Sequence, residues 1–231
     1  MAYHYKEFYR RKLPHIHPPR ATLFVTCRLA GSIPKAVVQN WRAEKEWLDD
    51  QIRRASKDAP AGVSIDLLVF QRRWFLKFEE ILDRARCGPT WLKDARVAAM
   101  VIDSLRHRDG KVYRLDAFCV MSNHLHVVFA PFLSERDLTE ERSGEGLRFK
   151  SSQPPLDSIM HSLKSFTAQE ANKLIGRVGT FWEAESYDHV IRTQDEFHRV
   201  VAYVVKNPVK AGLVQRWQDW PWSWRRESEV V

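Results

Sequence analysis

Two β-rich runs on either side of a short polar pair do most to limit what this chain can fold into. The first run is KVYRLDAFCVM (111–121) and the second is HLHVVFAP (124–131), with the turn-prone Ser122 and Asn123 between them. Two such runs around two polar residues predict a β-hairpin. The chain therefore contains an antiparallel sheet.

Helical and extended patterns surround this hairpin. Helices are predicted for 34–55, 66–85, 91–108, 156–176 and 193–207, and extended segments for 21–31 and 179–192. Helices between strands of one antiparallel sheet indicate an α+β fold, a ferredoxin-like split βαβ core with an inserted helical region. We interpret residues 1–231 as a single domain. It has a basic N-terminal arm (about 1–20), a helical insertion (about 34–108), a loop at 57–64 and a surface loop (about 134–155).

The charge balance points to a polyanionic partner. Lys and Arg number 37 against 29 Asp and Glu, a net charge of +8. Such an excess attracts nucleic acid, although a merely soluble basic protein is the alternative. Three cysteines without paired spacing suit a reducing compartment. No stretch resembles a signal peptide or a membrane span, so we expect a cytoplasmic protein without a membrane partner.

The pattern His-x-His occurs twice. In a strand, residues i and i+2 point to the same side, so His124 and His126 would stand roughly 7 Å apart and could share one divalent ion. His15 and His17 lie among prolines, which predicts a polyproline-like arm with nothing to align the two rings. Two ordinary strand histidines are the alternative for the second pair. The second pair is the better metal candidate, but it needs a third group.

The last predicted helix supplies candidates for that group. Thr193 and Glu196 form a capping box at its start, and Pro208 is expected to stop it. Its valines form one buried stripe, and Tyr203 lies at the edge of that stripe. Asn207 is one turn further along, on the same side. Tyr203 is either an ordinary boundary tyrosine or one whose hydroxyl reaches a groove.

The combination of SNHLHVVF with YDHVIRTQDEFHRVVAYVVKNPVKAGLV and DWPWSW resembles the REP-associated tyrosine transposases. These belong to the HUH single-tyrosine superfamily, named for a His-hydrophobic-His motif. The resemblance covers the chain ends and the hairpin, and is weaker over 34–108 and 134–155. It implies that His124 and His126 bind Mg²⁺ or Mn²⁺, that Tyr203 is the nucleophile and that the Asn207 amide reaches the metal. Tyr187, off the motif helix, is the rival nucleophile.

The implied function is cleavage and transfer of single-stranded or hairpin DNA at palindromic repeats through a phosphotyrosine. Candidate DNA contacts are Arg10, Arg11, Lys12, Arg20 and Lys164, with His15 and His17 as possible additions. A solvated basic terminus is the alternative. Two rival functions stay open, a non-catalytic hairpin-binding module and a metal-dependent nuclease that uses water. The oligomeric state, monomer or homodimer, is also open.

Overall fold

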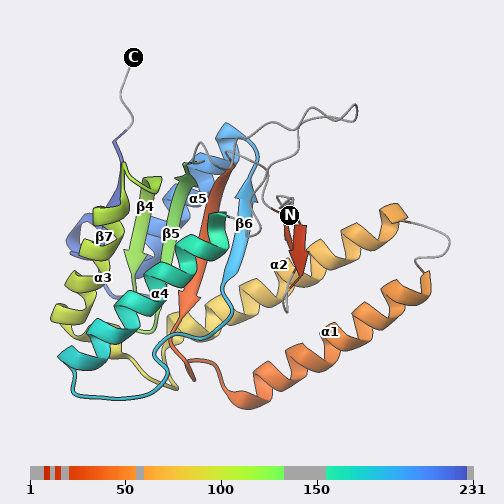
Figure 1. The fold of residues 1–231 in the computed structure, drawn as a ribbon, viewed down its shortest axis with the longest axis horizontal. Helices are drawn as coiled ribbons and strands as arrows, with labels where there is room; N and C mark the ends of the chain where they lie inside the picture. Colours follow the sequence, from red (N-terminus) through yellow and green to blue (C-terminus); the bar gives the residue numbers. More distant parts are fainter. Residues whose placement is uncertain (1–7, 11–13, 17–20, 56–59, 133–154, 228–231) are drawn as a thin grey trace, which may run out of the picture.

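The computed structural model describes residues 8–10, 14–16, 21–55, 60–132 and 155–227. Its centre is a five-stranded antiparallel sheet with the order β6-β3-β5-β4-β7 (Figure 1). The strands are β3 (Thr22–Arg28), β4 (Tyr113–Val120), β5 (His124–Pro131), β6 (Tyr187–Ile191) and β7 (Ser223–Arg225). Strands β4 and β5 form the predicted hairpin, which joins around Ser122 and Asn123.

The connections between strands define a split βαβ core. Strand β5 lies between β3 and β4, and β3 lies between β6 and β5. The chain crosses from β3 to β4 by way of helix α3 (Ala95–Arg108), and from β5 to β6 by way of α4 (Pro155–Leu174). Each crossover joins two parallel strands that are separated by an antiparallel one, which is the ferredoxin-like arrangement. The α+β fold class predicted from the sequence is confirmed.

The two faces of the sheet are covered by different helices. Helices α3 and α4 pack on one face around a large apolar cluster, and they lie in front of the sheet in Figure 1. Helix α5 (Gln194–Lys210) lies behind the sheet and packs on a smaller cluster. Hereafter these are the α4 face and the α5 face.

Helices α1 (Lys35–Ala55) and α2 (Pro60–Arg84) form a pair that extends from the body, as Figure 1 shows. Trp41, Phe70 and Trp74 are buried between them. Phe75 of α2 packs against the cluster on the α5 face. The C-terminal half of α2 therefore reaches the sheet and can bring side chains to it.

Several predicted boundaries were wrong. Residues 60–64 begin helix α2 instead of a loop, because Pro60 stands at the first helical position, where its missing N–H costs nothing. Residues 91–93 form a 3₁₀ turn, and α3 begins only after Asp94, whose side chain accepts from the Arg96 amide at 2.9 Å. Of the extended segment 179–192, only β6 is a strand.

The prediction that the first histidine pair lies in a polyproline-like arm was also wrong where the structure describes it. Strands β1 (Phe8–Arg10) and β2 (Pro14–Ile16) form a small antiparallel sheet in which His15 pairs with Tyr9. Pro14 is the first residue of its strand, where a missing amide hydrogen is tolerated. His17 and residues 134–154 of the predicted surface loop lie outside the described residues. Residue 155, the last of that predicted loop, instead begins helix α4.

Candidate active site

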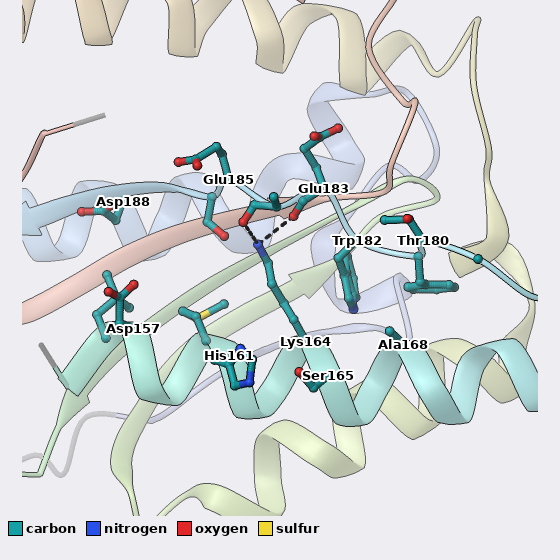
Figure 2. A pocket seen from close by; sticks show the side chains of 16 residues that line it. Asp157, His161, Lys164, Ser165, Ala168, Thr180, Trp182, Glu183, Glu185 and Asp188 are labelled. Atoms are coloured by element: carbon teal, nitrogen blue, oxygen red, sulfur yellow. Dashed lines mark hydrogen bonds between the residues drawn. The ribbon is translucent and has the colours of Figure 1, made fainter. Parts of the chain in front are cut away.

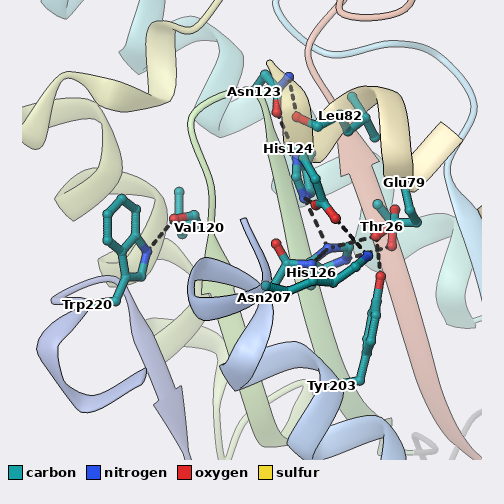
Figure 3. A network of polar contacts seen from close by, with 12 residues as sticks. Thr26, Glu79, Leu82, Val120, Asn123, His124, His126, Tyr203, Asn207 and Trp220 are labelled. Atoms are coloured by element: carbon teal, nitrogen blue, oxygen red, sulfur yellow. Dashed lines mark hydrogen bonds and ion pairs between the residues drawn. The ribbon is translucent and has the colours of Figure 1, made fainter. Parts of the chain in front are cut away.

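Strand β5 sends its alternate residues to opposite faces of the sheet. Leu125, Val127 and Phe129 join the cluster on the α4 face, whereas His124 and His126 point to the α5 face. The two imidazoles are fully buried and their Nε2 atoms are 3.0 Å apart (Figure 3). The predicted convergence of this pair is therefore present in the structure.

The other ring nitrogens are held by polar neighbours. Thr26 of β3, directly opposite His126 in the sheet, places its Oγ1 2.8 Å from His126 Nδ1. His124 Nδ1 donates to Asn123 Oδ1 at 2.7 Å, and the Asn123 amide donates to the Leu82 carbonyl at 3.1 Å. Because an amide oxygen only accepts, the proton of a neutral His124 is on Nδ1. Its Nε2 lone pair then faces the cluster, as a metal-binding histidine requires.

A carboxylate that the sequence analysis did not identify completes the group. Glu79 of α2 is buried, and its Oε2 lies 3.1 Å from His126 Nε2. One ligand atom each from Glu79, His124 and His126 lies within 4.8 Å of the others. Among the described residues this is the group of histidine, cysteine and carboxylate side chains that could hold a metal ion.

The sequence did hold a signal for Glu79. Trp74 and Phe78 of α2 pack toward α1, and Phe75 packs on the α5 face. With the buried Leu82 they form one apolar stripe of the helix, and Glu79 falls on it. A charged residue on an apolar stripe is seldom buried without a partner. A glutamate in this position therefore indicates a candidate site residue.

Burial sets the protonation of this group. Burial, and then the neighbouring His126, lower the pKa of His124 to about 3, so the ring is neutral near pH 7. Burial alone would raise the pKa of Glu79, but the contact with His126 lowers it to about 2. The site thus offers a neutral imidazole and an ionised carboxylate, both in the form that binds a cation.

Tyr203 of α5 reaches the same carboxylate. Its hydroxyl donates a hydrogen bond to Glu79 Oε2, the oxygen that also contacts His126 (Figure 3). Its ring packs edge-on against Phe24 and His126, with centroid distances of 6.0 and 5.7 Å. Burial, followed by the adjacent Glu79 anion, raises the pKa of the phenol well above its usual range. The tyrosine is thus half-buried, with its hydroxyl inside the site.

Asn207 also reaches the site, because α5 does not stop before Pro208. The helix continues to Lys210, which corrects the prediction that Pro208 ends it. Hydrogen bonds continue past the proline: the Asn207 carbonyl accepts from Ala211 N at 2.9 Å, an ordinary helical bond, and the Pro208 carbonyl accepts from Leu213 N at 2.9 Å. Asn207 is fully buried with Nδ2 3.2 Å from His126 Nε2.

The remaining candidates lie elsewhere. Tyr187, the rival nucleophile, stacks on Phe75 with ring centroids 4.0 Å apart, and burial raises the pKa of its phenol. Lys164 lies on α4, on the other side of the sheet (Figure 2). There it lines a cavity of about 400 Å³ and donates to the carbonyls of Glu183 and Ala184 at 2.9 and 3.0 Å.

Four of the candidate DNA contacts belong to the basic N-terminal arm. Arg10 ends strand β1. Arg11, Lys12 and Arg20 lie outside the described residues.

The fold and the site combine in one arrangement that can be compared with known proteins. A split βαβ sheet carries a buried His-His-Glu cluster, and a tyrosine on an adjoining helix is bonded to it. In comparisons with known proteins, no protein-family model matches the chain. A curated relative is the REP-associated tyrosine transposase of Escherichia coli (strain K12), 26% identical over 164 residues, which cover 66% of this chain and 79% of that protein. The resemblance identified from the sequence motifs is thereby confirmed.

A solved structure was also found, that of a REP-associated tyrosine transposase bound to a REP hairpin. It is 16% identical, with a TM-score of 0.45 over 93% of this chain and 80% of that chain. Within the part of the chain that the structure describes, none of the helices is long and apolar enough to cross a membrane.

Proposed function

We propose that this chain is a metal-dependent single-stranded DNA endonuclease and strand transferase that acts on hairpin or palindromic DNA through a phosphotyrosine at Tyr203. The observation that carries the proposal is the meeting of three elements at one carboxylate. The Tyr203 hydroxyl, from α5, donates to the Glu79 oxygen, from α2, that also contacts His126 of β5. A nucleophile and a candidate cation site are therefore adjacent.

The donor set fits Mg²⁺ or Mn²⁺. His126 Nε2 lies within 3.2 Å of three polar atoms, one each from His124, Glu79 and Asn207. A ring nitrogen offers one hydrogen or one lone pair and cannot satisfy all three partners. A cation among these atoms would relieve the conflict, with His124, His126 and Glu79 as ligands.

Asn207 is a further ligand candidate. Its Oδ1 is buried and has no hydrogen-bond partner within the described ranges. Its two amide heavy atoms are distinguished only by the contacts they make, and a half-turn of the amide would exchange them. The amide oxygen would then face His126, where a hard cation accepts it. We therefore keep Asn207 as a ligand and add Glu79 to the set.

The chemistry follows from these positions. A bound cation would polarise the scissile phosphate and offset the charge that develops on it. The Tyr203 oxygen forms a bond to phosphorus, and its proton leaves to solvent by way of the Glu79 carboxylate, which already accepts the hydrogen bond. The bond from phosphorus to the 3′ oxygen breaks, and that oxygen takes up a proton to leave as a 3′ hydroxyl. The 5′ phosphotyrosine keeps the phosphodiester for rejoining.

The proposed DNA partner rests on similarity and charge. The E. coli relative is a REP-associated tyrosine transposase, and the solved protein is bound to a REP hairpin. The net charge of +8 suits a polyanion. Arg10, Arg11, Lys12 and Arg20 stay candidates for phosphate contacts. Lys164 is a weaker candidate, because its ammonium already donates to two backbone carbonyls.

One experiment tests the proposal. The protein is incubated with a labelled single-stranded hairpin and Mn²⁺, and denaturing gels are examined for a covalent protein–DNA adduct. We expect an adduct with the wild type and with Tyr187→Phe, and none with Tyr203→Phe. An adduct that persists in Tyr203→Phe overturns the assignment of the nucleophile.

The same experiment separates the rival functions. Cleavage without any adduct would indicate a nuclease that uses water. Hairpin binding without cleavage, unchanged in Tyr203→Phe and His124→Ala, would indicate a non-catalytic binding module. The proposal requires that His124→Ala abolishes cleavage while hairpin binding persists.

A further inference from the structure

A second carboxylate lies beside the cluster and is paired with a lysine. Asp83 follows Glu79 by four residues on α2, so both point to the same side of the helix. Asp83 Oδ1 is 4.0 Å from His124 Nε2, and Oδ2 is 2.7 Å from Lys210 Nζ. The Asp83 side chain is only 10% exposed. Its Oδ1 has no hydrogen-bond partner among the residues that the structure describes.

Lys210 connects this carboxylate to the tyrosine helix. It follows Tyr203 by seven residues and Asn207 by three, so all three lie on one side of α5. Its ammonium lies 5.6 Å from the centre of the Tyr203 ring, and its side chain is 52% exposed. The lysine is thus a half-exposed cation beside the Tyr203 ring, with one buried partner.

We propose that Asp83 is a metal ligand held in reserve by Lys210, and that Lys210 exchanges this partner for a phosphate of the DNA. The inference rests on the proposed function. An orphaned carboxylate oxygen 4.0 Å from a candidate ligand atom needs only a side-chain rotation to reach a shared cation. Oxygen donors are those that Mg²⁺ and Mn²⁺ prefer.

Competition for Asp83 couples the two binding events. While Lys210 pairs with Asp83, the lysine opposes coordination of the carboxylate by metal. When a DNA phosphate takes the ammonium, Asp83 is released toward the cation. DNA and metal then each raise the affinity for the other by the same factor, as linkage requires.

The test is calorimetric titration of the full chain with MnCl₂, without DNA. Asp83→Asn should weaken Mn²⁺ binding by about tenfold, the lower end of the range for a group that supports a metal site. Lys210→Gln should strengthen Mn²⁺ binding, because the competitor for the carboxylate is gone. These opposite signs separate the proposal from a merely structural ion pair, because loss of either partner of such a pair would loosen the same contact between α2 and α5 and change the affinity in the same direction.

A matched ion pair provides the control. Arg114 and Asp116 pair at 2.9 Å with side chains 52% and 4% exposed, close to the exposures of Lys210 and Asp83. Arg114→Gln and Asp116→Asn should leave Mn²⁺ affinity unchanged. Thermal unfolding of all four variants shows whether each one is folded, and Asp83→Glu should restore part of the affinity.

The exchange itself is tested with hairpin DNA and Tyr203→Phe, which binds without being consumed. The hairpin should raise Mn²⁺ affinity in Tyr203→Phe, and raise it less in the double variant with Lys210→Gln.

Equal or same-signed effects of Asp83→Asn and Lys210→Gln on Mn²⁺ affinity overturn the inference. If His126→Ala binds Mn²⁺ as tightly as the wild type, both the proposed function and this inference are overturned. Loss in His126→Ala with no effect of Asp83→Asn overturns the Asp83 role alone.

Discussion

The two faces of the central sheet bury their side chains equally well but use them differently. On β5, Leu125 and Val127 are 1% and 0% exposed on the α4 face, and His124 and His126 are 0% exposed on the α5 face. Burial of a leucine side chain stabilises the folded protein, whereas burial of an imidazole costs free energy. One strand therefore contributes stability through one set of alternate residues and a candidate reactive site through the other.

The two faces also differ in whether their buried polar atoms have hydrogen-bond partners. On the α4 face, Tyr113 donates to the Leu105 carbonyl at 2.9 Å, and Trp182 donates to Thr167 at 2.8 Å. On the α5 face, Asn207 Oδ1 and Asp83 Oδ1 have no hydrogen-bond partner within the described ranges. Buried polar atoms that go unsatisfied cost about 1–3 kcal/mol each. Asp83 Oδ1 and Asn207 Oδ1 lie beside two candidate metal ligands, His124 and His126.

The largest expected effect on stability comes from the α4 face. Leu125 lies between the two histidines in the sequence, but its side chain is buried on the α4 face. Leu125→Ala should lower the free energy of unfolding by about 2–5 kcal/mol. Urea unfolding measures the change. The folded variant should still bind Mn²⁺ with unchanged affinity. A loss of metal binding would mean that the two faces are not independent.

Mn²⁺ should stabilise the folded protein, and it should do so only through side chains on the α5 face. At a free Mn²⁺ concentration of 100 times Kd, the free energy of unfolding of the wild type should rise by about 2.7 kcal/mol. Glu79→Gln keeps the shape and the acceptor for Tyr203 but removes the charge, so it should gain far less at the same concentration. Calorimetric unfolding with and without Mn²⁺ measures both. An equal gain in Glu79→Gln would exclude this carboxylate as a ligand.

A smaller effect is expected at the residue that orients the first histidine. Asn123 accepts from His124 and donates to the Leu82 carbonyl, which ties the hairpin turn to α2. Asn123→Ala should weaken Mn²⁺ binding by about 10–100-fold, which corresponds to about 1.4–2.7 kcal/mol. Titration with MnCl₂ provides the measurement. Unchanged affinity would show that the ring of His124 is oriented by packing alone.

The sequence was sufficient for features that depend on local pattern. The hairpin, the convergence of His124 with His126 and the start of α5 at Thr193 follow from alternation, spacing and a capping box. Each of these involves residues close together in the chain. Local physics determines them, so the sequence analysis could find them.

Features that depend on distant segments were missed. Glu79 enters the site because α2 packs against α5 and the sheet, and helical periodicity alone does not say which element a stripe will cover. Pro208 was expected to stop α5, but the helix continues to Lys210 and the Asn207 carbonyl still accepts from Ala211 N. Asn207, whose ligand role depended on that helical turn, is thereby brought within 3.2 Å of His126.

The smallest effect is expected at the N-terminus of the tyrosine helix. Thr193 Oγ1 accepts from the Glu196 amide at 3.1 Å, and the Glu196 side chain accepts from the Arg192 amide at 2.7 Å. Thr193→Ala should cost about 1 kcal/mol of unfolding free energy, measured in urea. The cap lies two to three turns from Tyr203, so Mn²⁺ affinity and adduct formation should match the wild type. A drop in adduct yield without a drop in metal affinity would show that fraying of this end moves the tyrosine, and that the stability and chemistry of the α5 face are coupled along the helix.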